Sequence, residues 1–490
     1  MNKAHSLDAD FPAARLYRAL HEPAARMVRE TATQDGVSFS ERHLQCVWYD
    51  AAWRPAALAT SRGEEVVVES PGRWNLEAGP DFIGAALRIG PDRRRLCGDV
   101  EIHVRPMDWR EHGHGGGYAG VIAHVSYFPG ELPPGTLPAG AVQISLRDAL
   151  KTVPSFSFDS IDTTAYPFAT FPSEDSPCAR VLGAWTHEQR MAFLDSAGEE
   201  RLRRKAERAE ADVQRNGADQ ALYEGIMSAL GYKHNRAAFA RMARVVTQQT
   251  LRDEADGDAL SAYALLLGVA GLIPAKAPPG ADEDTRRFIR QLWNRWWKCQ
   301  SRWAGCLMSR EDWKLSSLRP QNHPVRRLAA AACLFSARES LAERLAAIDA
   351  SRPDAWFAGV ARLFEDDAGV AYWKHRLGFS GTRRPQAVSL LGTGRIAAIQ
   401  SNVIVPFLAA TGRDVAALLP FLPAEEDNAL LRQTAHALFG RDHNPALYHE
   451  GLKQQGLLQV FHDFCLVSRS GCAECRLPPA LSSATTSFAR

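Results

Sequence analysis

Two acidic residues lie on neighbouring predicted strands. Asp81 follows Pro80 at the head of a strand predicted over residues 82–89, and Glu101 lies inside a strand predicted over residues 95–104. Adjacent strands that each contribute one inward-facing carboxylate can hold a hard divalent cation. Such a cation polarises a phosphate and lowers the pKa of a water nucleophile. The pair therefore predicts a hydrolytic site for Mg²⁺ or Mn²⁺.

The second of these strands carries further polar side chains on the same face. Because alternate residues of a strand share a face, Asp99, Glu101 and His103 point to one side and the intervening apolar residues to the other. This pattern predicts an apolar face packed on helices and a polar face lining a cleft. Bringing Asp81 beside it concentrates negative charge, which a cation or raised pKa values would relieve.

The same residues resemble the core motif of PD-(D/E)xK nucleases. Pro80-Asp81 is followed, after 19 residues, by Glu101-Ile102-His103, with His103 where that family usually has lysine. The resemblance implies a restriction-endonuclease-like α/β core with a mixed sheet and flanking helices, in the order helix, strand, strand, strand. It implies that Asp81 and Glu101 bind metal, with Asp99 or the helix residue Glu41 in support. His103 would replace a lysine that positions water or stabilises charge, although neutral imidazole supplies less positive charge.

Over nearly its whole length the chain also resembles an uncharacterised bacterial family with no assigned activity. The segments that carry this resemblance are residues 71–75, 79–82, 98–103, 121–125, 229–233, 319–322 and 402–406, together with the C-terminal cysteines. This resemblance implies no mechanism.

A histidine-rich segment follows the second strand. His112 and His114 lie in a glycine-rich stretch, and His124 lies in a strand predicted over residues 121–127. With His103, these histidines beside the acids could bind Zn²⁺, Mn²⁺ or Fe²⁺ and hydrolyse an ester. The alternative is a flexible surface loop. In a combined arrangement, His112 or His114 would contact the scissile phosphate or act as general acid.

Three cysteines near the C-terminus have ligand-like spacing. Six residues separate Cys465 from Cys472, and two separate Cys472 from Cys475. Thiols this close in a reducing compartment usually bind metal, so we predict Zn²⁺ or [4Fe–4S], with unliganded thiols as the alternative. The spacing resembles the iron–sulfur loop of helix-hairpin-helix DNA glycosylases, whose fourth cysteine corresponds to Leu481 here. Some PD-(D/E)xK nucleases also hold such a cluster through one distant cysteine. The candidate fourth ligands are Cys178, Cys299, Cys306, Cys333 and a histidine such as His462.

The whole chain of 490 residues is too long for one ordinary core. We expect a nuclease-like domain over residues 1–150, an irregular linker with aromatic anchors over 151–182, an all-helical domain over 183–464, a cysteine cluster over 465–478 and a disordered tail over 479–490. A formal net charge of +2 means that affinity for polyanions must come from local patches. The chain shows no secretory signal or membrane-spanning segment, and nine cysteines in an uneven set suggest reduced thiols in the cytoplasm.

Two basic stretches of the helical domain bear on nucleic-acid binding. Between residues 284 and 303 cations alternate with large rings, a combination that can hold single strands. The rings fall on one helical stripe, which predicts core and leaves Arg290, Arg295, Lys298 and Arg302 as candidate phosphate contacts. The run of cations from Arg201 to Arg208 alternates with glutamates and predicts a solvated, salt-bridged helix face.

Taken together, these features predict metal-dependent cleavage of nucleic-acid phosphodiesters, with DNA favoured over RNA as the partner and no membrane. One alternative is a nucleic-acid-binding protein that has lost activity on the same scaffold, which His103 makes credible. Another is a His/carboxylate metallohydrolase of a small substrate.

Overall fold

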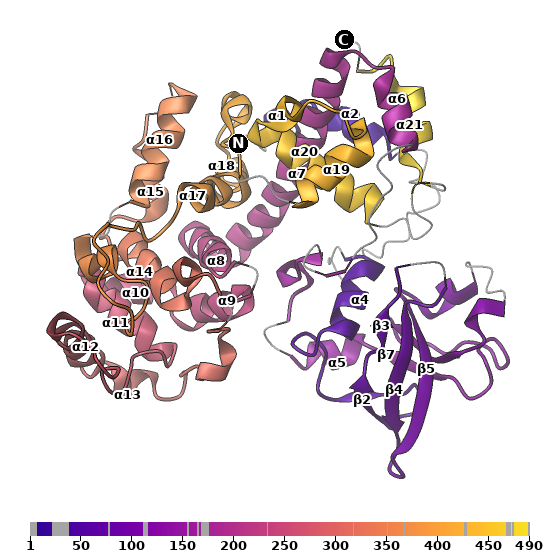
Figure 1. Ribbon diagram of the computed structural model, residues 1–490, viewed down its shortest axis with the longest axis horizontal. Coiled ribbons are helices and arrows are strands. Elements are labelled where there is room, and N and C mark those ends of the chain that lie inside the picture. The colour runs from indigo at the N-terminus through magenta and orange to yellow at the C-terminus, as the bar shows by residue number, and fades with distance from the viewer. Residues whose placement is uncertain are drawn as a thin grey trace.

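The computed structural model shows a sheet domain in the N-terminal part of the chain and a larger helical part after it (Figure 1). It describes residues 7–21, 39–76, 79–110, 116–153, 156–163, 166–167, 176–232, 234–316, 318–349, 351–365, 368–425, 429–466, 472 and 475–488. The fold is therefore a mixed α/β domain followed by a predominantly helical one.

A mixed sheet forms the first domain. Strands β2 (Glu65–Ser70), β4 (Phe82–Ile89) and β5 (Arg94–His103) are antiparallel, and β6 (Val121–Ser126) and β7 (Val142–Ser145) add in parallel beyond β5. The strands predicted over residues 82–89, 95–104 and 121–127 are thus confirmed. Short strands β1 (Leu58–Ala59) and β3 (Arg73–Trp74) pair with β2 and β4. The backbone N–H of Ser61 donates to the carbonyl of Gln143 at 2.8 Å, so the β1 end of the sheet curls round to β7.

Helix α4 (Glu41–Tyr49) covers one face of this sheet (Figure 1). It begins in a capping box, in which the Ser40 N–H donates to His43 Nδ1 at 3.1 Å. Leu44 and Trp48, one turn apart, are buried in the core that contains Val100 and Ile102 of β5. The apolar face of β5 therefore packs on a helix, as its alternation predicts.

The helical part is organised around the long helix α7 (His187–Asn216). Its first half packs in one core with α2 (Ala14–Ala19), and its second half in a larger core. The other helices are α6 (Pro177–Gly183), α8 (Ala218–Leu230), α9 (Arg236–Val245), α10 (Gln248–Ala255), α11 (Ala259–Val269), α12 (Glu283–Trp296), α13 (Gln300–Trp303), α14 (Pro324–Phe335), α15 (Leu341–Ala346), α16 (Pro353–Leu363), α17 (Thr393–Ile399), α18 (Val405–Ala410), α19 (Ala429–Phe439), α20 (Gly451–Val460) and α21 (Leu477–Ala484).

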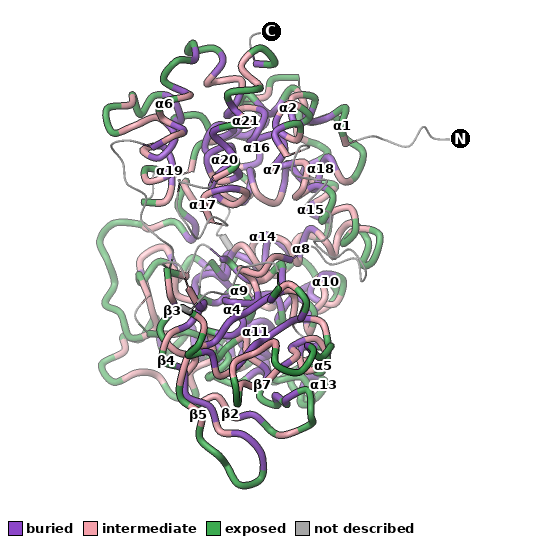
Figure 2. The backbone as a smooth tube through the Cα atoms, turned by 90° about the vertical axis from the view of Figure 1, so that its right-hand side faces the viewer, coloured by how far each residue is buried: buried purple, intermediate pink, exposed green. Residues whose placement is uncertain are grey.

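Two glycines set the close approach of α7 to α20. A Cβ at Gly198 would overlap the backbone oxygen of Leu452, and a Cβ at Gly456 would overlap that of Leu194. The two backbones are therefore in direct contact, and Figure 2 shows buried residues concentrated along these helices. This pair is the centre of the first of the two helical cores.

Both ends of the described chain pack against the helical part. Helices α1 (Leu7–Asp10) and α2 lie on α7, although they precede the sheet domain in sequence. The prediction of a disordered tail from residue 479 is wrong, because α21 packs on α6 and Leu481 and Phe488 are buried in its core. Apolar residues at helical spacing in this short segment supply the contacts that order it. Within the described residues, no helix has the length and apolar character needed to cross a bilayer.

Candidate functional site

Asp81 and Glu101 meet at the junction of β4 and β5. The backbone N–H of Asp81 donates to Glu101 Oε2 at 3.0 Å, and the N–H of Ile102 donates to Asp81 Oδ2 at 2.8 Å. The side chain of Asp81 is only 3% exposed, and Glu101 is fully buried. The structure therefore brings the two predicted carboxylates together in a desolvated position.

Helix α4 adds an amide to this pair. Gln45 Nε2 donates to Asp81 Oδ1 at 2.6 Å and lies 3.5 Å from Glu41 Oε1. Glu41 is half-buried and one helical turn before Gln45, so both lie on the face of α4 that meets the carboxylates. The sequence reasoning selected Glu41 and missed Gln45, although the spacing of four residues places both on one face.

Two histidines extend the site along β5 and β6. His103 Nε2 lies 3.6 Å from Glu101 Oε1, and His103 Nδ1 lies 3.0 Å from His124 Nε2. The last two nitrogens share one hydrogen bond, in which one donates and the other accepts. The ring of Trp109, in the 3₁₀ helix η1 (Pro106–Arg110), stands edge-on to His124 with centroids 5.2 Å apart. Glu101, His103 and His124 therefore form a row beneath an aromatic side chain.

The polar face of β5 does not line an open cleft in this structure. Glu101 and His103 are both fully buried, and η1 packs against β5 and β6 over them. The predicted cleft-lining face is therefore covered. Among the described residues, no group of three or more His, Cys, Asp or Glu side chains is already arranged around a metal position.

Asp99 supports an irregularity of the sheet. The pairing of β4 with β5 shifts register between Phe82 and Ala85, and the Gly84 N–H in this bulge donates to Asp99 Oδ1 at 3.0 Å. Gly84 has a φ of +70°, a conformation that favours glycine. Asp99 thus satisfies a bulge amide next to the carboxylate pair, and its predicted part in metal binding stays a prediction.

Cations of α7 lie close to α4. The pKa of His43 is lowered to about 4, chiefly by burial, with Asp159 opposing and Arg208 and Arg42 contributing. Arg208 is exposed, and desolvation is the largest cause that lowers its pKa, while Asp159 acts in the opposite direction. The run Arg201–Arg208 was predicted to be a solvated, salt-bridged face, and Arg203 and Arg204 do pair with Glu200, each at 2.7 Å. The electrostatic effect of Arg208 on His43 of α4 was not predicted.

A polar network fixes two further cations of α7. Lys205 Nζ donates to Asn402 and, at 3.1 Å, to Gln455 Oε1, which also accepts from Arg201 Nε at 3.0 Å. Glu425 Oε1 accepts from both Asn402 and Gln455. Burial is the largest cause that lowers the pKa of Lys205. These cations are therefore held by amides and one carboxylate, and the sequence reasoning did not foresee this arrangement.

In the basic and aromatic stretch of α12 and α13, the apolar side chains are buried in the core and three arginines on the other side form ion pairs. Phe288, Leu292, Trp296, Cys299 and Trp303 are all buried, which confirms the predicted stripe. Arg290 pairs with Glu283 at 2.7 Å, Arg295 with Asp258 at 3.1 Å and Arg302 with Glu254 at 2.7 Å. Because these carboxylates already neutralise the guanidinium groups, this surface is a weak candidate for phosphate binding.

Of the remaining predicted site residues, two are not described and three lie in the helical part. His112 and His114 fall outside the described residues, so their predicted roles stay predictions. Cys465 ends the π-helix η11 (Phe461–Cys465), and Cys472 and Cys475 precede α21. All nine cysteines are described, and all are free thiols. Burial is the largest cause that raises the pKa of Cys178 of α6, one of the candidate fourth ligands, and these three thiols add to it. No three of these four described cysteines are arranged to hold a metal ion, so the predicted metal site stays a prediction.

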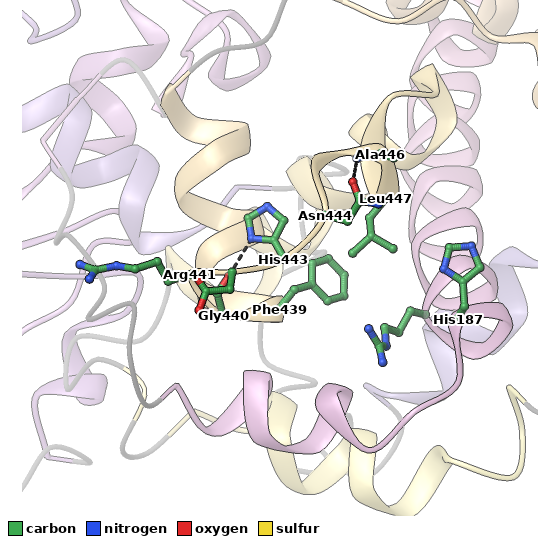
Figure 3. A pocket seen from close by; sticks show the side chains of 10 residues that line it. His187, Phe439, Gly440, Arg441, His443, Asn444, Ala446 and Leu447 are labelled. Carbon is green, nitrogen blue, oxygen red and sulfur yellow. Dashed lines mark hydrogen bonds between the residues drawn. The ribbon is translucent and has the colours of Figure 1, made fainter.

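A cavity of about 850 Å³ lies between the start of α7 and the loop after α19 (Figure 3). Phe439, the last residue of α19, and His443 of the loop point toward it. His187 faces them from α7, whereas Arg441 points away. Arg190 donates twice to the Trp185 carbonyl, and His443 Nδ1 lies 2.7 Å from the Gly440 carbonyl. These polar groups are engaged with the backbone, and nothing at this cavity resembles the carboxylate pair of the sheet domain.

The fold and site define a protein with a buried carboxylate pair in a mixed α/β domain, followed by a larger helical part. The chain belongs to the family described as protein of unknown function (DUF2851), whose model matches residues 41–418. The match includes α4, the carboxylate pair and α7, and it ends before Cys465. No curated protein and no solved structure matches the chain.

Proposed function

We propose that this protein is a metal-dependent phosphodiester hydrolase that acts on nucleic acid, with DNA as the expected polymer. The observation that carries the proposal is the pairing of Asp81 with Glu101 across adjacent strands, in contact with Gln45 of α4. The order α4, β2, β4, β5 agrees with the helix and three strands that the PD-(D/E)xK resemblance implies.

The donor set of this site fits a hard divalent cation. The hydrogen bonds to Asp81 and Glu101 described above come from neutral donors, namely two backbone amides and the Gln45 amide. A carboxylate oxygen carries two lone pairs, so it can accept a hydrogen bond and hold a cation at the same time. Two carboxylates buried this close favour a bound cation or a shared proton. When bound, Mg²⁺ or Mn²⁺ would polarise the phosphate and activate water.

The protein's own groups would orient the carboxylates, move a proton and bind the phosphate backbone. Gln45 and the Ile102 N–H orient the Asp81 carboxylate, and the Asp81 N–H orients Glu101. His103, 3.6 Å from Glu101 and hydrogen-bonded to His124, is placed to hold or move a proton at Nε2. Arg208, close to α4, supplies positive charge for a phosphate backbone.

One observation favours the second candidate, an inactive nucleic-acid-binding protein on the same scaffold. Glu101 and His103 have no exposed surface, so a polymer reaches them only if η1 moves away from β5 and β6. A protein that has lost catalysis would keep the cations near α4 and could leave this face covered.

The deciding experiment is incubation of the purified full-length protein with labelled single- and double-stranded DNA and RNA in Mg²⁺ or Mn²⁺. We expect cleavage that falls at least about 100-fold in Asp81→Asn and in Glu101→Gln, because each removes a metal-binding charge. Asp92→Asn, in the exposed turn between β4 and β5, is the matched control and should cleave like the wild type.

The outcomes separate the candidates. Binding without cleavage in every variant would establish the inactive scaffold and overturn the hydrolase. Cleavage that survives in both carboxylate variants would show that the activity lies elsewhere. If none of the proteins binds any polymer, the nucleic-acid proposal fails and small phosphoesters become the substrates to test.

A further inference from the structure

Two cations of α7 share one neutral acceptor. Arg201 Nε and Lys205 Nζ both donate to Gln455 Oε1 of α20, at 3.0 and 3.1 Å, which makes the two positive charges close neighbours. They are four residues apart, so they lie on one face of the helix. Lys205 also donates to the Asn402 side-chain oxygen. Within the described part of the chain, neither member of this cation pair, Arg201 and Lys205, forms an ion pair with a carboxylate.

Neutral amides hold the cation pair in place, and one carboxylate lies behind them. Glu425 Oε1 accepts from Asn402 Nδ2 at 2.7 Å and from Gln455 Nε2 at 3.1 Å, so it is linked to the cations through these amides. Both amide oxygens are thereby turned toward the cation pair. Asn402 lies on the π-helical turn η8 (Gln400–Ile404), and such turns occur frequently at functional sites. The two charged groups are therefore fixed before any ligand arrives.

The neighbouring cations of α7 have carboxylate partners. Glu200 accepts from Arg203 Nε and from Arg204 Nε, each at 2.7 Å. Asp463 accepts from Arg204 Nη1 at 2.9 Å. These carboxylates are committed to other guanidinium groups. Half-buried cations normally have such a partner, because desolvation without a counter-charge is costly. The cation pair lacks one, which distinguishes it from the ion pairs beside it.

The cation pair keeps donors for a ligand and lies in an excess of positive charge. Arg201 uses only its Nε–H, which leaves both Nη groups, and Lys205 keeps one of its three ammonium N–H groups. Both side chains are half-buried, so solvent reaches them. Burial is the largest cause that lowers the pKa of Lys205, followed by Arg201. Arg208 and Arg236 of α9 also lower it, against Glu425. An anion beside Lys205 would relieve this repulsion.

We propose that the cation pair binds a phosphate group, carried by a free phosphate or by the end of a nucleotide or nucleic-acid strand. The Arg201 guanidinium can present parallel N–H groups to two phosphate oxygens, while Lys205 adds a compact charge at a third. A phosphate dianion supplies the counter-charge that the described carboxylates do not. Because the charged groups are already held, little side-chain freedom is lost on binding. The proposal does not rest on the hydrolase, because no residue of the carboxylate site takes part.

The missing counter-charge gives this site a signature in stability. Lys205→Gln removes one of two repelling charges and keeps a hydrogen-bonding side chain, so its unfolding temperature without phosphate should equal or exceed that of wild type. Wild type should gain several degrees when a phosphate ligand is added, and Lys205→Gln should gain none. A purely structural lysine predicts the reverse, namely a less stable variant and no response of wild type to phosphate.

The experiment measures binding of inorganic pyrophosphate to the full-length protein by calorimetry and thermal unfolding, at constant ionic strength and without divalent cations. Their absence excludes binding through a metal at the carboxylate site, so failure here and failure of the hydrolase are distinguishable. Arg201→Gln and Lys205→Gln should each weaken binding at least about tenfold. Arg215→Gln is the matched control, because it removes an equal charge from the end of α7, where Arg215 pairs with Asp212 at 3.0 Å. It should bind like wild type.

A second pair of probes identifies the source of the phosphate. Tighter binding of a 5′-phosphorylated oligonucleotide than of its 5′-hydroxyl form, lost in Arg201→Gln, would assign the site to a strand end. Equal binding of the two forms, with pyrophosphate still bound, would assign it to a free phosphate or a nucleotide. Wild type that binds neither pyrophosphate nor the phosphorylated strand overturns the proposal. Folded Arg201→Gln and Lys205→Gln that both keep wild-type affinity also overturn it.

Discussion

Glu199 is a buried carboxylate whose titration should be visible in the stability of the whole protein. It lies on α7, is 8% exposed and accepts a hydrogen bond from the Ala13 N–H at 2.6 Å. Burial raises its pKa to about 7, although the Ala13 and Ala14 amides lower it. The folded protein therefore keeps a proton that the unfolded chain releases near its ordinary pKa of about 4.5.

This difference fixes the sign of a pH effect. The contribution of Glu199 is fully present below about pH 4.5 and is lost as pH rises to about 7. Glu199→Gln should remove the loss, so that the free energy of unfolding at pH 8 rises by about 1–3 kcal/mol relative to wild type. Urea unfolding of both proteins between pH 5 and 8 checks this, with Glu207→Gln, half-exposed on the same helix, as control. Parallel pH profiles for wild type and Glu199→Gln would contradict it.

At this scale the sequence predicted the carboxylates but not their partners. Glu101 and His103 follow from strand alternation and Asp81 from its place at the head of the preceding strand, and in the structure Asp81 and His103 both lie next to Glu101. Gln45 was missed because an amide in a helix is a common surface residue until its partner is known. Arg208 was missed because its place near α4 depends on how two separate domains pack, which no local pattern encodes.

At the scale of elements, helical periodicity located most of the helices but not their interruptions. The apolar spacing of residues 236–252 predicts one helix, whereas α9 ends at Val245 and Thr247 caps α10 by accepting from the Thr250 N–H. The spacing of residues 396–409 and 448–463 likewise predicts two helices. The π-helical turn Gln400–Ile404 lies inside the first, and the turn Phe461–Cys465 begins in the second and runs past its predicted end. A π-helical turn holds about one residue more than an α-helical turn, which barely alters the apolar spacing, so the sequence did not reveal these turns. They carry Asn402 and Cys465.

The contact between α7 and α20 gives a prediction at this scale. Gly198→Ala should lower the free energy of unfolding by about 1–3 kcal/mol, because its Cβ would overlap the backbone of Leu452 and force the helices apart. Gly183→Ala, also helical but with nothing near its Cβ, is the matched control and should be neutral or slightly stabilising. Chemical denaturation measures both. Equal stabilities for the two variants would show that α7 and α20 separate without cost.

At the scale of the whole molecule, Arg208 of α7 lies within electrostatic range of His43 of α4. Asp159 acts electrostatically on both His43 and Arg208, so a cation of the helical part lies near the helix that lines the carboxylate site. A hydrolase of a polyanion needs positive charge at such a place, since phosphate contacts dominate its affinity. The near-neutral net charge of the chain makes the position of these cations, rather than their number, decisive.

The final prediction tests that position. Arg208→Gln should weaken binding of labelled DNA and reduce the slope of log affinity against log salt by about 1, because one phosphate contact is lost. Arg290→Gln removes an equal charge from α12, where Glu283 already pairs with it, and should leave affinity and slope unchanged. Fluorescence anisotropy between low and moderate salt measures both quantities with Asp81→Asn as the parent, so that cleavage does not consume the probe. If instead Arg290→Gln weakens binding and Arg208→Gln does not, the nucleic acid lies on the basic and aromatic surface of α12, far in sequence from the carboxylates. The proposal that Arg208 of α7 contacts phosphate beside the carboxylate site of α4 would then be wrong.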